Sequence, residues 1–284
     1  MTRTIVFIHG AWMTPLCWDR FKTEFEGRGY ACLAPAWPGK EGTVAQINAD
    51  PSALAGLGIT EIVAHYEQLI RRLDEPPIII GHSFGGLFTQ ILLDHGLGAA
   101  GVALDPAAPR GVFAFEPSAF RSLASVLFTW RGWRKVVRWT PARFRYAFVH
   151  NLSEADAKAA YDEYVTPETG RIFFQAAYSL LARHSPARVD FRNGTRAPLL
   201  IVSGEDDHIV PPGTVRRNYK AYARSAARTD FLLFPGRTHW LIGRMSAECA
   251  FCATALPLAE ASMRSHNGPV SIQHKNRDGH AWAA

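Results

Sequence analysis

Long apolar runs are missing from this sequence of 284 residues, and none approaches the roughly 20 residues that a membrane-spanning helix needs. The first apolar run, residues 4–8, leads straight into His9 and Gly10 without the cleavage region that follows a signal peptide. Internal repeats and the patterns of nucleic-acid-binding modules are also absent. We therefore expect a soluble, cytoplasmic protein without a membrane span and without a nucleic-acid partner.

Cysteine is scarce, with four residues in the chain: Cys17, Cys32, Cys249 and Cys252. The last two have the spacing of a redox or metal-binding pair, but they lie in a helical pattern, and no second pair of matching spacing exists. The simpler interpretation is that both are buried thiols. The sequence thus predicts no metal and no cofactor.

Acidic residues are nearly absent between Pro106 and His150, where Glu116 is the one acid among eight basic residues. Three tryptophans, Trp130, Trp133 and Trp139, lie among these bases. We interpret the stretch as the solvated basic face of amphipathic helices. A surface for an anionic partner, or for a nucleic acid, remains an alternative interpretation.

The apolar residues that are present, 48% of the chain with the aromatics included, occur in short runs that alternate with helical patterns. Fully apolar strands that alternate with helices predict an α/β fold, with a roughly six-stranded, mostly parallel sheet and helices on both faces. The expected strands are residues 4–8, 30–34, 78–80, 101–104, 199–202 and 231–234.

The alternation breaks between residues 106 and 195, which show aromatic-rich helical patterns and no strong strand. We interpret this stretch as a helical cap inserted into a core formed by residues 1–105 and 196–264. Ser153 is expected to begin one of its helices. Another should follow Thr166, with an inward face that would include Leu180 and Leu181. The polar residues 265–284 are expected to form a flexible tail.

A serine between two glycines, Gly81-His82-Ser83-Phe84-Gly85, follows the third apolar run and precedes a helical pattern. A sharp turn from a strand into a helix exposes such a serine in a strained backbone conformation, and glycine is needed two residues before and after it. The following helix directs backbone N–H groups at any oxyanion that forms. This context predicts that Ser83 is a nucleophile.

A serine hydroxyl needs a general base, and the base needs an acid to hold its tautomer. His239 follows the sixth predicted strand, at the same edge of the sheet as Ser83, and is our candidate for the base. The acid would come from the end of the fifth strand, where Asp207 is preferred. Glu205 and Asp206 beside it, and Asp105 after the fourth strand, remain alternatives.

The order Ser, Asp, His, with each residue at a different strand end, resembles the α/β-hydrolase superfamily over about residues 3–105 and 196–255. That family's oxyanion turn is similar to the segment TIVFIHGAWM of this sequence. Its acid loop is similar to SGEDDHIVP, and its histidine loop is similar to GRTHW. The resemblance implies that the backbone N–H groups of Ala11 and Phe84 form the oxyanion hole, and that Asp207 is the acid.

The resemblance also implies a carboxylic ester hydrolase that forms an acyl-enzyme. Aromatic residues of the insertion, with Trp12, Met13 and Trp240, are expected to line a pocket for a hydrophobic ester, thioester or lactone. A lyase, a cyclase, a perhydrolase or cofactor-free haloperoxidase, and a slowly turning-over receptor remain alternatives. A hydroxynitrile lyase would need a positive group near His239, where Arg237 is the one candidate in the histidine loop. The sequence makes no prediction of the oligomeric state.

Overall fold

The computed structural model describes residues 3–113, 116–179 and 181–243. Its centre is a six-stranded, fully parallel sheet with the strand order β2-β1-β3-β4-β7-β8. The strands are β1 (Thr4–Ile8), β2 (Ala31–Leu33), β3 (Ile78–His82), β4 (Ala100–Leu104), β7 (Leu199–Gly204) and β8 (Thr229–Phe234). All six expected strands are confirmed, with ends that differ by a few residues at most.

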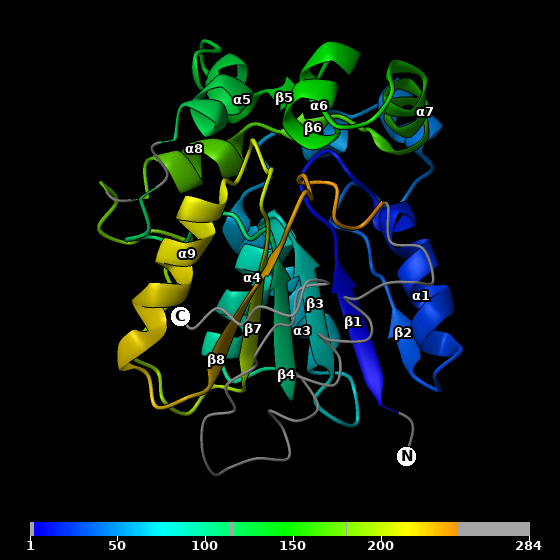
Figure 1. Cartoon of the computed structure of the whole chain (residues 1–284). Helices are drawn as coiled ribbons and strands as arrows, with labels where there is room; N and C mark the ends of the chain where they lie inside the picture. The colour runs from blue at the N-terminus through cyan, green and yellow to red at the C-terminus, as the bar shows by residue number, and fades with distance from the viewer. Residues whose placement is uncertain (1–2, 114–115, 180, 244–284) are drawn as a thin grey trace, which may run out of the picture.

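The central strands are buried on both faces, because helices cover the sheet. Every residue of β3, β4 and β7 is buried, as expected for parallel strands that lie between helical layers. In Figure 1, α3 (Ile59–Ile70) and α4 (Phe84–Asp94) lie behind the sheet. At its two ends lie α1 (Asp19–Glu26), beside β2, and α9 (Pro212–Ala221), beside β7 and β8.

Residues between β4 and β7 form a cap above the carboxyl ends of the strands, at the top of Figure 1. Its helices are α5 (Pro117–Leu127), α6 (Pro141–Phe148), α7 (Glu154–Tyr164) and α8 (Arg171–Ala177). Two short strands, β5 (Val136–Val137) and β6 (Glu168–Thr169), pair antiparallel within it. The sequence analysis expected no strong strand in this stretch and did not locate these two, because two-residue strands are too short to produce an alternating pattern.

Helix ends follow the sequence where a capping side chain is present. Ser153 accepts a hydrogen bond from the backbone N–H of Asp156 at 3.1 Å, which confirms the predicted start of α7. A capping box between Thr43 and Gln46 starts α2 (Val44–Ala49). The expected inward face of α8 is wrong at Leu181, which lies beyond the end of the helix and is 83% exposed.

Four short 3₁₀ helices complete the elements of the described residues: Pro15–Trp18, Ser52–Leu54, Gly132–Arg134 and Tyr222–Arg224. Basic side chains on the cap, among them Arg121, Arg131 and Arg134, are exposed as predicted. No described helix has the length and hydropathy of a membrane span. Cys249, Cys252, the helix predicted around them, Leu180 and the predicted tail lie outside the described residues.

Candidate active site

Ser83 occupies the turn between β3 and α4, with φ 56° and ψ −118°. A positive φ is strained for a residue other than glycine, and such strain at a turn from a strand into a helix is typical of a nucleophile elbow. The flanking glycines are sterically required. A Cβ on Gly81 would lie 2.0 Å from the carbonyl oxygen of Gly85, and one on Gly85 would lie 2.1 Å from that of Ile8.

His239 and Asp207 come from the turns after β8 and β7, and the structure brings them together. The His239 Nδ1–H donates to Asp207 Oδ2 at 2.6 Å, and both side chains are fully buried. The other oxygen, Oδ1, accepts from the backbone N–H groups of Ile209 at 2.7 Å and Val210 at 2.8 Å. The two turns are also joined directly, because the N–H of Asp206 donates to the carbonyl of Arg237 at 2.8 Å.

This arrangement fixes the tautomer of His239. With the proton on Nδ1 held by Asp207, Nε2 is left as an acceptor, and it is buried without a hydrogen-bond partner in the described part of the chain. Burial lowers the pKa of His239, which keeps the ring neutral. A neutral imidazole with a free acceptor nitrogen is the form that a general base requires.

A second carboxyl group, Asp105, lies at the end of β4 beside this pair. Its Oδ1 accepts from the N–H of Gly204 at 2.7 Å, and its Oδ2 has no partner among the described residues. Burial raises the pKa of both Asp105 and Asp207, and the neighbouring Asp207 carboxylate raises the pKa of Asp105 further. Because Asp207 accepts more hydrogen bonds, we assign it the negative charge and Asp105 the proton.

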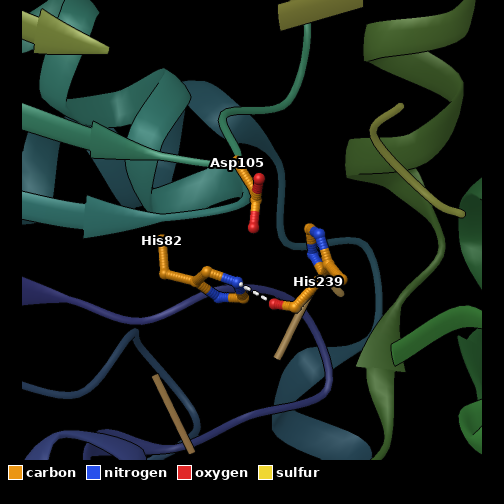
Figure 2. A group of neighbouring side chains, drawn as sticks. All are labelled: His82, Asp105 and His239. Atoms are coloured by element: carbon orange, nitrogen blue, oxygen red, sulfur yellow. Dashed lines mark hydrogen bonds between the residues drawn. The ribbon is translucent and has the colours of Figure 1, made fainter. Parts of the chain in front are cut away.

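Figure 2 shows His82, Asp105 and His239 converging from three strand ends. His82, the residue before Ser83, donates from Nε2 to the backbone carbonyl of His239 at 2.8 Å, drawn as the dashed line. The two imidazole rings lie 4.6 Å apart. His82 therefore fixes the histidine loop to the elbow, a role for which its sequence position gave no signal.

The same three residues offer metal-ligand atoms within 4.8 Å of one another. Coordination there would occupy His239, whose Nδ1 already binds Asp207 and whose Nε2 is the candidate base atom. The donor set therefore competes with general-base chemistry.

The turn after β1 lies directly against the elbow. A Cβ on Gly10 would come within 2.8 Å of Ser83 Cβ, so the predicted oxyanion residue Ala11 is next to the nucleophile. Phe84 begins α4 immediately after Ser83. The positions suit two backbone donors, one at the start of α4 and one in the turn after β1, while the donor role of each N–H stays a prediction.

Aromatic rings of the cap meet the expected pocket residues. Trp12 stacks between Trp139 and Phe173, at ring distances of 3.5 and 4.6 Å. Phe148 lies 4.5 Å from His239, at nearly a right angle. Trp240 contacts Phe144 and Tyr164 at 5.9 and 5.2 Å. Met13 is fully buried. Of these cap residues, Phe148 is the one in ring contact with the base, which its helical spacing alone did not indicate.

A parallel sheet with a serine elbow, and with a histidine and an aspartate meeting at neighbouring strand ends, defines a class of enzyme folds. The sequence matches the Alpha/beta hydrolase family over residues 5–250, and the chain belongs to that family. No curated protein matches the sequence.

Solved structures with the same fold include ester-cleaving enzymes, at sequence identities that establish the fold alone. A monoacylglycerol lipase of Paleococcus ferrophilus is 19% identical, with a TM-score of 0.60 over 93% of this chain and 96% of the other. A pyrethroid hydrolase of Sphingobium faniae is 15% identical, with a TM-score of 0.62 over 93% and 100%. An Arabidopsis methylesterase is 14% identical, with a TM-score of 0.62 over 92% and 100%.

Proposed function

We propose that this protein is a serine hydrolase that cleaves a carboxylic ester, thioester or lactone of a hydrophobic substrate through an acyl-enzyme. The observation that carries the proposal is the strained Ser83 elbow beside a His239–Asp207 pair joined at 2.6 Å. Lipase, pyrethroid hydrolase and methylesterase neighbours with the same fold support ester cleavage as the reaction.

In the proposed reaction, the Ser83 oxygen attacks the carbonyl carbon, and His239 Nε2 takes the hydroxyl proton. The N–H groups of Ala11 and Phe84 stabilise the oxyanion of the tetrahedral intermediate. His239 then returns the proton to the leaving alcohol or thiol. Water repeats the sequence on the acyl-enzyme, which releases the acid and restores Ser83. Asp207 orients His239 and stabilises the imidazolium throughout.

The preference for hydrophobic substrates is supported by the rings around the site. Phe148 faces the base, and Phe173 contacts both Trp12 and Phe84, at ring distances of 4.6 and 5.2 Å. Apolar walls with few polar groups favour an acyl or aryl group over a small polar one. Arg237 is exposed, so it is poorly placed to supply the buried positive charge that a hydroxynitrile lyase would need.

A panel of aryl and alkyl esters, thioesters, lactones and amides tests the proposal, with product analysis for each substrate. Ser83→Ala should lower the rate by about 10⁴-fold or more, while the exposed Ser52→Ala control should retain it. If the Ser83→Ala variant retained most of the wild-type activity on an activated aryl ester, the assignment of Ser83 as the nucleophile would be overturned. Products of elimination, cyclisation or peroxidation without hydrolysis would identify a non-hydrolytic enzyme instead.

A further inference from the structure

A buried ion pair joins the cap to the core beside the oxyanion turn. Lys40, in the loop after β2, lies 2.8 Å (Nζ to Oε2) from Glu168 in the cap strand β6, and both side chains are 0% exposed. Burial lowers the pKa of Lys40, and the Glu168 carboxylate opposes that change. The pair is separate from Ser83, His239 and Asp207.

The ion pair holds the backbone on both sides of Trp12. Glu168 Oε2 accepts from the Trp12 N–H at 3.0 Å, and Lys40 Nζ donates to the carbonyl of Met13 at 3.1 Å. Thr166, which accepts from Lys40 Nζ at 3.1 Å, donates its own N–H to the Trp12 carbonyl at 2.9 Å. Three residues from outside the turn therefore bind three polar groups of its backbone, all within Trp12 and Met13.

The bound segment is strained. Trp12 has φ 62°, a conformation that residues other than glycine rarely adopt. Trp12 follows Ala11, whose N–H is the expected oxyanion donor. The hydrogen bond to Glu168 fixes the plane of the Ala11–Trp12 peptide group, which limits the orientations that Ala11 can take. Without that acceptor, Trp12 would be free to relax to a negative φ, and the turn that presents the Ala11 N–H would change shape.

Stability alone explains this pair poorly. Two charges buried without water gain from their mutual attraction about what they lose in desolvation, and apolar residues of similar volume often serve stability as well or better. Oxyanion stabilisation, in contrast, depends on donors that are fixed before charge develops. A buried carboxylate that binds the turn's own backbone meets that requirement.

We propose that Lys40 and Glu168 are positioning residues that hold the oxyanion turn in its catalytic shape, so that the cap completes the active site as well as covering it. This inference rests on the proposed hydrolase function. Removal of one oxyanion donor typically lowers kcat by about 10²–10³-fold. Displacement of a donor that remains present should cost less, and we expect about 10- to 100-fold.

Two charge-neutral double variants test the inference. Lys40→Met/Glu168→Gln keeps one of the two side-chain oxygens, which can still accept from the Trp12 N–H, whereas Lys40→Met/Glu168→Leu removes the acceptors of both the Trp12 and the Thr169 N–H groups. Neither leaves an unpaired buried charge, so neither carries the main cause of misfolding that a single substitution here would have. The control is Glu61→Leu, which removes the exposed ion pair to Arg171 (2.9 Å) that also joins core to cap.

The measurements are kcat and KM on an ester that the wild-type protein cleaves, with thermal unfolding of each variant. We expect the Leu double variant to have a kcat about 10- to 100-fold below that of the Gln double variant, with KM within about threefold. Glu61→Leu should match the wild type. Equal kcat in the two double variants, or a difference confined to KM or to Tm, would overturn the inference.

Failure of the inference is distinguishable from failure of the proposed function. If Ser83→Ala abolishes ester cleavage while the two double variants are equal in kcat, the hydrolase assignment stands and the positioning role is wrong. If Ser83→Ala retains cleavage, both are wrong, because no oxyanion would form at this turn.

Discussion

The rim of the sheet and the cap above it contribute different things to the same site. At the rim, short turns hold Ser83, Asp207 and His239 through backbone strain and hydrogen bonds of 2.6–2.8 Å. In the cap, Phe148 and Phe173 reach the site through ring contacts of 4.5–5.2 Å, which carry no charge and bind no proton. Changes at the rim should therefore abolish the chemical step, whereas changes to these two cap rings should alter which substrate is accepted.

The largest effect is expected from His239→Ala. Loss of the base should lower kcat by about 10⁴-fold or more, because the Ser83 hydroxyl then has no proton acceptor. Steady-state kinetics on the best ester of the panel measure the effect. His95→Ala, at an exposed histidine bound to Glu67, is the matched control and should be neutral. A small loss in His239→Ala would remove the distinction between rim and cap.

Next in size is the contrast between two carboxyl groups of the rim. Asp207→Asn should lower kcat by about 10³–10⁴-fold, since an amide in place of the carboxylate favours the wrong tautomer of His239. Asp105→Asn removes a carboxyl group that lies near His239 but makes no hydrogen bond to it in the described part of the chain, and we expect about tenfold or less. The kcat values of the two variants on one substrate show which carboxyl group acts as the acid. A larger loss in Asp105→Asn would exchange their roles.

A smaller effect, on the preference between substrates, is expected from Phe173→Leu in the cap. The shorter side chain loses its ring contacts with Trp12 and Phe84, so kcat/KM for bulky aryl esters should fall about tenfold relative to short alkyl esters. Competition between the two ester types measures the ratio. Phe120→Leu, at a cap residue that is 58% exposed, should leave it unchanged. An equal loss on both ester types would mean that this part of the cap supports catalysis and not selection.

The smallest effect expected is a loss of stability in mild acid. Burial lowers the pKa of His9, His82 and His239, so protonation accompanies unfolding once the pH falls below about 6.5, and the free energy of unfolding decreases there. The raised pKa of the Asp105–Asp207 pair acts in the opposite sense, because unfolding releases its proton above about pH 4.

The protons that three histidines take up on unfolding should outnumber the one that the carboxyl pair releases. Urea unfolding at about pH 7.5 and about pH 5 tests this. The urea concentration at the midpoint should be greater at the higher pH. A lower midpoint concentration at the higher pH would show that the carboxyl pair, and not the histidines, determines how stability changes with pH.

The sequence predicted the elements that depend on local patterns. Apolar runs located all six strands, and the glycines around Ser83 located the elbow, because a Cβ at either position would collide with a backbone carbonyl. Positions after β7 and β8 placed Asp207 and His239 at one edge of the sheet, where the structure shows them bonded. Each of these signals lies within about ten neighbouring residues.

What the sequence did not predict depends on contacts between distant segments. Lys40 and Glu168 are charged residues in a loop and in a two-residue strand, and nothing in their surroundings indicates that they are buried together. Asp105 was a rival to Asp207, and the sequence alone could not show that Asp207 is the carboxylate bonded to His239. The ring contacts of Phe148 and Phe173 depend on how α6 and α8 fold over the sheet, which helical periodicity alone cannot determine.

The insertion of the cap between β4 and β7 also has a kinetic consequence. The register pairs Val102 with Leu200, so these adjacent strands are separated by roughly a hundred residues of chain. Closing a loop of this length has an entropic cost that β3 and β4, joined by a far shorter segment, do not share. Ser83 lies on one side of that junction, and Asp207 and His239 lie on the other. Activity that needs all three residues should therefore appear during refolding only once β4 and β7 have paired.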